Sequence, residues 1–256
     1  MAPQRIRLSW ATEPFDLHLT PLHALIGPAG VGKTATLDAV RVPPGYTDPE
    51  EDTFDGASGL FGLASLLKGH LASIYRQWDL IGKYYPWVEG LEEGKMRPFP
   101  RVFCKGPSTN SHHPCVSYPS LASLLVAIAL PDICKERHYT LICIDNPDHN
   151  FHPEQIADVM KLLRHTADSG VQVVVATNNP LVINEMQPEE VTVLTRGEHG
   201  PKATLLRDTW NFAERSRFYA LGELWLLHGG NNEHDLLHEP QPNGKAAAEP
   251  SKIEDK

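Results

Sequence analysis

The fold of this chain is indicated most clearly by the stretch LHALIGPAGVGKTATLDAV, residues Leu22–Val40. Its first five residues, Leu22–Ile26, predict a strand, and Ala35–Arg41 predicts a helix that stops before two consecutive prolines. Between them, GPAGVGKT fits the pattern G-x-x-x-x-G-K-[ST], in which glycines let backbone N–H groups point at a phosphate. We therefore expect a phosphate-binding loop between a strand and a helix.

Two side chains of this loop carry the predicted chemistry. Lys33 would supply a cation to the terminal phosphates of a nucleotide, and Thr34 would offer its hydroxyl to Mg²⁺. The alternative is a chance glycine-rich turn, against which the flanking strand and helix argue. The predicted nucleotide site consists of Gly27, Pro28, Ala29, Gly30, Val31, Gly32, Lys33, Thr34 and Ala35.

A second strand supplies the other half of the predicted site. The apolar run Leu141–Ile144 is typical of a buried strand and is followed directly by Asp145. Because parallel strands end at one edge of a sheet, the Asp145 carboxylate is expected beside the loop, where it would hold Mg²⁺ together with Thr34. The alternative is an acid that merely ends a strand.

The rest of the chain predicts an α/β domain. Val171–Ala176 is a continuous run typical of a parallel strand that is buried on both faces. A helix is expected from Pro153 to just before Gly170, an apolar helix over Ser120–Leu130, and helical structure over Leu60–Leu91. The segments VTVL and ATLL predict a closing hairpin.

Composition narrows the class of protein. At 256 residues and 41% hydrophobic content the chain can bury a full core. Its formal net charge of −9 argues against a dedicated DNA-binding surface, although a local basic groove is left open. Four scattered cysteines, with no signal-peptide pattern and no apolar run long enough for a membrane span, predict a reduced, cytoplasmic protein.

Three stretches together resemble the ABC-type AAA ATPases related to the structural-maintenance-of-chromosomes (SMC) and overcoming-lysogenization-defect families. They are ALIGPAGVGKTATLDAV, IDNPDHNFHP and VVVATNNPLVINEM, and the ending FYALGELWL is similar to that of small bacterial members. The resemblance implies a P-loop NTPase fold with an ABC-ATPase-like mixed sheet flanked by helices. It also implies ATP and Mg²⁺ as ligands and a nucleotide-dependent head-to-head dimer or heteromeric pair.

The same resemblance suggests a division of the chain. Residues 1–239 would form the ATP-binding domain, with a helical insert and a degenerate signature loop over residues 58–119. Residues 240–256 are polar and rich in Pro, Ala and Lys, so we expect a disordered tail there.

Three positions depart from the family pattern. In the motif D-E-P-E-x-x-L-H-P the second residue is the catalytic glutamate, and here it is Asn146. The switch histidine is matched by Asn178, within TNNP. The signature is at best VSYP, Val116–Pro119, in which Pro119 replaces a glycine and has no N–H to offer the partner's γ-phosphate.

These departures leave hydrolysis open. An amide is no base near neutral pH, and losing general-base assistance costs roughly 10²–10⁴ in rate, unless Asp148 or His149 substitutes. The sequence predicts a slow ATPase or an ATP-dependent dimerisation switch in a DNA-repair or anti-phage defence assembly, beside a separate nuclease or toxin. The alternatives are a non-hydrolysing regulatory partner and the nucleotide-binding subunit of a transporter.

Three further candidates have structural alternatives. Cys104, His112, His113 and Cys115 include zinc-ligand types, but their spacing matches no standard finger. Gln77 stands where the family places a glutamine that touches metal, or it is a surface helix residue. A set of cations and aromatic residues could bind single strands or pack a lid; it comprises Arg76, Lys83, Trp78, Tyr84, Tyr85 and Trp87.

Overall fold

The structure is a computed structural model, and its secondary structure covers most of the chain. It describes residues 4–8, 15–41, 59–94, 99–104, 112–114, 117–197 and 200–228. The strands are β1 (Gln4–Leu8), β2 (Phe15–Leu19), β3 (Leu22–Ile26), β4 (Val88–Glu92), β5 (Arg101–Cys104), β6 (His112–Pro114), β7 (Leu141–Asp145), β8 (Gln172–Ala176), β9 (Val191–Gly197) and β10 (Gly200–Leu205). The helices are α1 (Lys33–Arg41), α2 (Leu71–Tyr75), α3 (Trp78–Tyr84), α4 (Pro119–Arg137), α5 (Pro153–Asp168), α6 (Pro180–Asn184), α7 (Phe212–Arg215) and α8 (Leu221–His228), with 3-10 turns η1 (Leu60–Leu67), η3 (Pro188–Glu190) and η4 (Leu206–Asp208).

The main sheet has five strands in the order β10-β9-β3-β8-β7. β3 runs parallel to β8 and to β9, β7 runs parallel to β8, and β10 is antiparallel to β9. The sheet is therefore mixed, as expected, and the predicted closing hairpin is β9–β10. A separate two-stranded hairpin, β1–β2, lies beside it.

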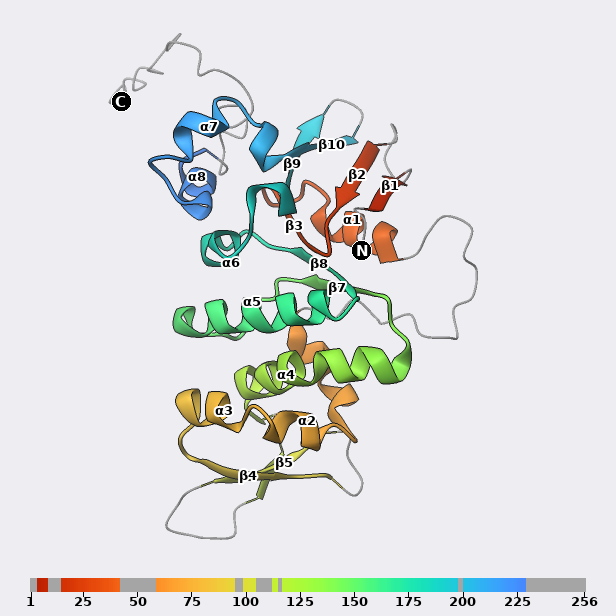
Figure 1. Ribbon diagram of the computed structural model, residues 1–256, viewed down its shortest axis with the longest axis vertical. Coiled ribbons are helices and arrows are strands. Elements are labelled where there is room, and N and C mark those ends of the chain that lie inside the picture. Colours follow the sequence, from red (N-terminus) through yellow and green to blue (C-terminus); the bar gives the residue numbers. More distant parts are fainter. Residues whose placement is uncertain are drawn as a thin grey trace, which may run out of the picture.

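Helices cover both faces of this sheet. Side chains of successive strand residues alternate between the faces, so Leu25 and Val174 pack with Leu37 of α1, whereas Ala24 and Val173 pack in the large core with α5. β8 is buried at every position, which confirms the predicted two-sided burial. Figure 1 shows α5 and then α4 as successive layers on the side away from α1.

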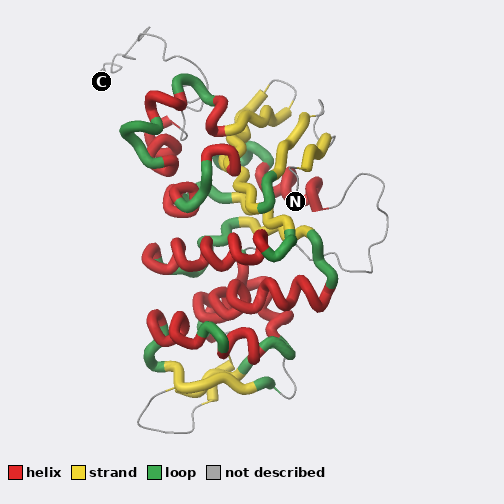
Figure 2. Tube along the Cα trace, viewed as in Figure 1, coloured by secondary structure: helices red, strands yellow, loops and turns green. Residues whose placement is uncertain are grey.

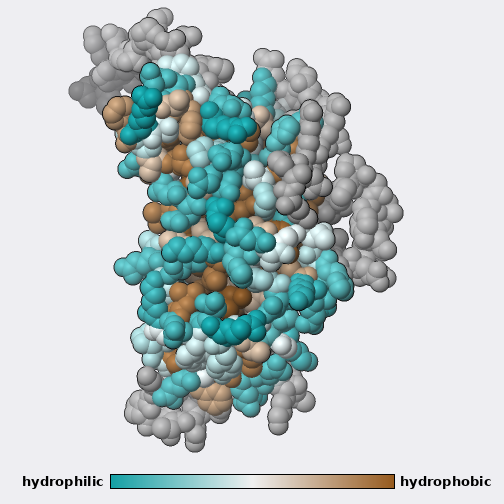
Figure 3. Space-filling view, in the orientation of Figure 1, coloured by the Kyte–Doolittle hydropathy of each residue, from teal (hydrophilic) through white to brown (hydrophobic). Residues whose placement is uncertain are grey.

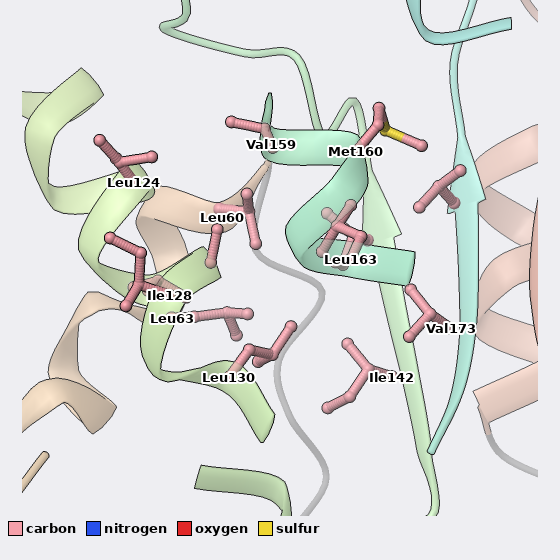
Figure 4. Packing of buried hydrophobic residues seen from close by; sticks show 14 of the residues in the cluster. Leu60, Leu63, Leu124, Ile128, Leu130, Ile142, Val159, Met160, Leu163 and Val173 are labelled. Carbon is pink, nitrogen blue, oxygen red and sulfur yellow. The ribbon is translucent and has the colours of Figure 1, made fainter. Parts of the chain in front are cut away.

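The centre of the molecule is α4. Twelve of its residues are buried, which is typical of a helix that is apolar all round. It continues past Leu130 through Pro131 to Arg137, so it is longer than the sequence predicted, and it ends at left-handed His138. Figure 4 shows side chains of α4, α5, η1 and the sheet meeting in one core; those labelled are Leu60, Leu63, Leu124, Ile128, Leu130, Ile142, Val159, Met160, Leu163 and Val173.

The insert is not one continuous helix. The predicted helical run divides into η1, α2 and α3, with a break at Gly69, whose φ is 90°, and then enters β4. β4, β5 and β6 form a three-stranded antiparallel sheet that the sequence did not predict. Figures 1 and 2 show this small sheet at the opposite end of the molecule from the main sheet, with helices between them.

The cations and aromatic residues of the insert hold it to the rest of the protein. Lys83 Nζ lies 2.6 Å from Asp158 Oδ2 on α5, and Tyr84 donates to the same carboxylate at 2.8 Å. Arg76 pairs with Asp132 on α4. The structure therefore favours packing over single-strand binding for this set.

On the face seen in Figure 3 the described surface is mainly hydrophilic, with hydrophobic side chains visible over α4 and at the α7–α8 end. Among the described residues, Phe218 and Leu226 are large hydrophobic side chains that are 81% and 64% exposed. Within the described ranges, no helix is long and apolar enough to cross a membrane. The predicted tail, residues 240–256, lies outside the described part of the chain.

Candidate functional site

The glycine-rich loop joins the end of β3 to the start of α1, as predicted. Gly30 and Gly32 have φ values of 74° and 98°, a left-handed region that favours glycine. At Gly27 an added Cβ would lie 2.5 Å from the Leu194 carbonyl oxygen of β9. The loop therefore needs its glycines both for its curvature and for its close approach to the neighbouring strand.

Lys33 lies at the first position of α1, and its ammonium group turns back over the loop. Nζ donates to the carbonyl oxygens of Gly27 at 2.7 Å and Pro28 at 3.0 Å. Burial lowers the pKa of Lys33 from its usual value, and the nearby Asp145 carboxylate opposes that shift. The loop thus holds its cation on backbone carbonyls that a bound phosphate would replace as partners.

The two predicted magnesium ligands are in direct contact. Thr34 Oγ1 donates to Asp145 Oδ2 at 2.6 Å, across 111 residues of sequence. Asp145 is the last residue of β7 and pairs with Ala176 of β8, so its carboxylate sits at the sheet edge where the phosphate loop begins. A hydroxyl and a carboxylate are hard oxygen donors of the kind Mg²⁺ prefers, so this pair fits the implied ion.

Asn146 follows with a left-handed backbone, φ 53°. Its N–H donates to the Ala176 carbonyl at 2.7 Å, and its side-chain Nδ2 donates to Asp145 Oδ1 at 3.1 Å. Asn adopts this backbone region more readily than most residues. The position that the resemblance assigns to the catalytic glutamate is therefore an exposed amide that donates to the Asp145 carboxylate.

Asp148 connects two loops at this edge. Its Oδ1 accepts from the Thr177 hydroxyl, and its Oδ2 accepts from Asn179 Nδ2, both at 3.0 Å. Asp148 is one of the two predicted replacement bases, but both of its carboxylate oxygens already accept hydrogen bonds from the loop after β8. His149, the other candidate, is exposed.

Asn178 lies in that loop, two residues beyond β8. Thr177 N–H donates to the Leu25 carbonyl at 3.1 Å, which anchors the loop beside β3. The Asn178 side chain is exposed, and the backbone carbonyl oxygen of Asn178 accepts from Trp225 Nε1 of α8 at 3.2 Å. Asn178 therefore lies at the same sheet edge as the phosphate loop and Asp145.

Arg196 is a residue that the sequence analysis missed. It stands near the end of β9, and its Nη2 donates to the Ala29 carbonyl at 3.0 Å. A second cation therefore contacts the outer side of the phosphate loop. Its only sequence signal is an Arg-Gly pair at a strand end, which does not reveal that β9 lies next to β3.

Other predicted residues lie away from this edge. The signature segment, of which Ser117–Pro119 is described, leads into α4, where Tyr118 packs against Trp87 at 4.8 Å between ring centroids. Gln77 precedes α3, beyond α4 and α5 from the phosphate loop (Figure 1), so it does not share the site. Cys115 and the side chains of His112 and His113 lie outside the described part, so zinc binding there stays a prediction.

One family model matches the sequence of this chain over one segment, and solved structures match its fold over most of its length. The family model described as "AAA domain, putative AbiEii toxin, Type IV TA system" matches residues 117–184. That segment runs from the signature segment through α6 and includes Asp145, Asn146 and Asn178. No curated protein matches the chain.

Two solved structures share the fold. The SMC head domain from Thermotoga maritima aligns at 12% identity over 80% of this chain and 99% of that chain, with a TM-score of 0.52. The SmcHead bound to the C-winged helix domain of ScpA aligns at 9% identity over 80% of this chain and 97% of that chain, with a TM-score of 0.53. This chain therefore shares its mixed α/β fold with these two SMC head domains, and its expected resemblance to AAA-type domains is confirmed over residues 117–184.

Proposed function

We propose that the chain binds ATP together with Mg²⁺ and acts as a slow ATPase or as an ATP-dependent dimerisation switch. The observation that carries this proposal is the 2.6 Å contact between Thr34 and Asp145 beside a glycine-rich loop that holds Lys33. Motifs 111 residues apart in the chain thus converge on one sheet edge with the donor types that a magnesium–nucleotide complex needs.

Different residues of the site would bind the phosphates and the magnesium ion. The loop backbone and Lys33 would hold the phosphates, and Thr34 and Asp145 would hold the ion. Bound Mg²⁺ supplies positive charge that stabilises phosphate oxygens. Because Lys33 hydrogen-bonds only to backbone carbonyls of the loop in the contacts described, exchanging them for an anionic phosphate strengthens its interactions.

Slow hydrolysis is supported by the side chains around the reacting position. Asn146 cannot accept a proton from water near neutral pH. Asp148, the nearest replacement, accepts from Thr177 and Asn179, so moving it to a water would break both hydrogen bonds. A general base normally contributes roughly 10²–10⁴ in rate, and we expect turnover to be reduced on that scale.

The absence of a carboxylate at Asn146 also favours a second candidate function. A chain that binds ATP and never cleaves it would serve as a regulatory partner of an active subunit. Measurable single-turnover cleavage by the purified protein would favour the slow ATPase, and its complete absence at saturating ATP would favour the regulatory partner.

The proposed dimer is supported by the position of the signature segment. Ser117–Pro119 leads into α4, which α5 and the sheet separate from α1 and the phosphate loop. One copy therefore does not bring its signature segment to its own loop, whereas a second copy, or a related subunit, could supply one. The second of the two similar SMC heads is bound to the C-winged helix domain of ScpA, and the matched family model is described as an AAA domain and putative AbiEii toxin. We accordingly propose a DNA-repair or defence assembly with a separate nuclease or toxin.

Light scattering tests the dimerisation directly. Mass in solution is measured with Mg²⁺ and a non-hydrolysable ATP analogue, with Mg²⁺ and ADP, and without nucleotide. We expect the mass to double with the analogue alone. An unchanged mass, despite saturating binding by calorimetry, would contradict the homodimer and require a different chain as partner.

A further inference from the structure

The loop that follows β8, residues Thr177–Pro180, lies where it can respond to a bound nucleotide. β8 lies between β3 and β7, and its last residue, Ala176, pairs with Leu25 on one side and Asp145 on the other. The loop therefore starts between the strand that leads into the phosphate loop and the strand that ends in the proposed magnesium ligand. We call residues Thr177–Pro180 the switch loop.

Hydrogen bonds join the switch loop to the segment after β7 and to α6. Asp148 holds it to the segment after β7 through Thr177 and Asn179. Within the loop, Asn179 N–H donates to Thr177 Oγ1 at 2.9 Å, and Asn179 Oδ1 caps α6 by accepting from Leu181 N–H at 2.9 Å. A displacement of the loop would thus be passed directly to α6.

One contact connects this loop with the C-terminal helix. Trp225 Nε1 of α8 donates to the carbonyl oxygen of Asn178 at 3.2 Å, and the Trp225 side chain is only 5% exposed. A buried indole N–H needs an acceptor, and the acceptor used is the backbone carbonyl of Asn178, which follows β8 at the same sheet edge as the phosphate loop and Asp145. The hydrogen bond thereby fixes one side of the Asn178 peptide.

α8 packs closely on α6. Gly222 N–H donates to Asn184 Oδ1 at 2.7 Å, and an added Cβ on Gly222 would lie 2.2 Å from the Pro180 carbonyl oxygen. Figure 1 shows α6 and α8 next to each other at one flank of the sheet. Because α8 packs closely on α6 and Trp225 contacts the loop from α8, a displacement of the loop either carries α8 with it or breaks the Trp225 hydrogen bond.

We infer that Trp225 is a positioning residue that couples the switch loop to α8, so that the nucleotide at the phosphate loop changes the Trp225–Asn178 hydrogen bond. The inference rests on the proposed ATP binding. By linkage, a contact that differs between the ATP and ADP states also changes the relative affinity for the two nucleotides when it is removed.

The indole N–H signal of Trp225 in ¹H–¹⁵N NMR spectra reads this hydrogen bond. Signals are assigned by their loss in Trp225→Phe and in Trp210→Phe. Trp210 is the matched control, because it lies in the same C-terminal region. Arg215 Cζ lies 5.8 Å from the centroid of its ring. We expect the Trp225 signal to shift between the ADP state and the state with Mg²⁺ and a non-hydrolysable ATP analogue, and the Trp210 signal to stay in place.

Calorimetry on the same proteins supplies the second readout. Loss of one hydrogen bond corresponds to roughly a two- to tenfold change in an equilibrium, so Trp225→Phe should change the ratio of ADP and analogue affinities by about that factor, and Trp210→Phe should not. A Trp225 signal that is identical in both states, or an unchanged ratio, overturns the inference while ATP binding stands. Absence of ATP binding in the unmodified protein overturns the proposed function and this inference with it. If Trp225→Phe does not fold, Trp225→Leu, which also lacks a side-chain donor, replaces it, and the signal of the intact protein still decides.

Discussion

Asn146 is the residue at which the proposed function separates nucleotide binding from cleavage. Its amide donates to Asp145, so it fits the binding half of the site, while it offers no base to a water. We predict that Asn146→Glu increases single-turnover ATP cleavage by at most roughly 10²-fold, measured with the protein at dimerising concentration. The gain stays below the full value of a general base because Asn178 and the signature segment are unchanged.

The matched control for this prediction is Asn146→Ala. Both substitutions place a residue other than Asn at a φ of 53°, so both carry the same kind of backbone strain, roughly 1–2 kcal/mol, and only Glu adds a carboxylate. Fast cleavage by the unmodified protein that is unaffected in Asn146→Ala would show that another residue acts as the base.

His23 makes stability depend on pH. The ring is buried in β3, where Nδ1 lies 3.1 Å from Thr20 Oγ1 and Nε2 lies 2.9 Å from Thr192 Oγ1. Burial lowers the pKa of His23 from 6.5 to about 4, and Glu190 partly opposes the shift. Because the folded pKa is depressed, the unfolded chain binds the proton more readily, so stability is lost as the pH falls below the unfolded value of 6.5.

We therefore predict that the free energy of unfolding falls by about 2 kcal/mol through His23 between about pH 7 and about pH 5. Urea denaturation at both pH values measures the change. The variant His23→Gln cannot be protonated at this position. Its free energy of unfolding should therefore fall by about 2 kcal/mol less than that of the unmodified protein over the same pH interval. Equal losses in both proteins would show that His23 is not buried as a neutral ring.

At the scale of elements, α6 and α8 depend on one glycine. A Cβ on Gly222 would lie 2.2 Å from Pro180 O and 2.8 Å from Asn184 Oδ1, so Gly222→Ala should force α8 away from α6. We predict a loss of roughly 1–3 kcal/mol in the free energy of unfolding. Denaturant titration checks it.

Gly82 is the matched control, because it also lies within a helix, α3, and an added Cβ there meets nothing within 4 Å. Gly82→Ala should stabilise the protein by roughly 0.5–1 kcal/mol. If Gly222→Ala is also stabilising, the close packing of α8 on α6 is wrong, and the coupling through Trp225 loses its support.

The elements also show which parts of the structure could be predicted. The phosphate loop, β7 with Asp145 and the all-apolar α4 follow from local patterns, because each pattern lies within one or two elements. The strands β4, β5 and β6 were missed because they are only three to five residues long. In addition, β4 begins at Val88, within the run Leu60–Leu91 that the apolar spacing predicted to be helical. The helical run breaks at Gly69, which takes a left-handed backbone.

The missed parts of the site are contacts between distant segments. Arg196 meets Ala29 across 167 residues, and Trp225 meets Asn178 across 47. Such pairs depend on which strands and helices become neighbours, and no local periodicity encodes that. The hydrogen bonds of Asp148 with Thr177 and Asn179 were partly predictable. Both partners follow β8, the strand next to β7, but the strand order has to be known before the contact can be predicted.

In the whole molecule, the proposed site and the small sheet of β4, β5 and β6 lie at opposite ends of a stack of layers. The main sheet with the phosphate loop lies at one end, α5 and α4 follow, and the small sheet lies at the other end (Figure 2). The insert begins at the site, where Gly59 N–H donates to the Asp145 backbone carbonyl at 2.7 Å. Each copy thus presents its phosphate loop and its signature segment at different places, which is the arrangement expected of a chain that completes its site with a second copy or a related subunit.

The account depends on ATP·Mg²⁺ binding at the phosphate loop, which calorimetric titration measures most directly. ATP is titrated into the unmodified protein with Mg²⁺ or with EDTA, and into Lys33→Ala, with Lys161→Ala as control because that lysine pairs with Asp158 outside the site. We predict tighter binding with Mg²⁺ than with EDTA, no measurable binding in Lys33→Ala, and unchanged binding in the control. Equal affinity in Lys33→Ala and in the unmodified protein would contradict the account.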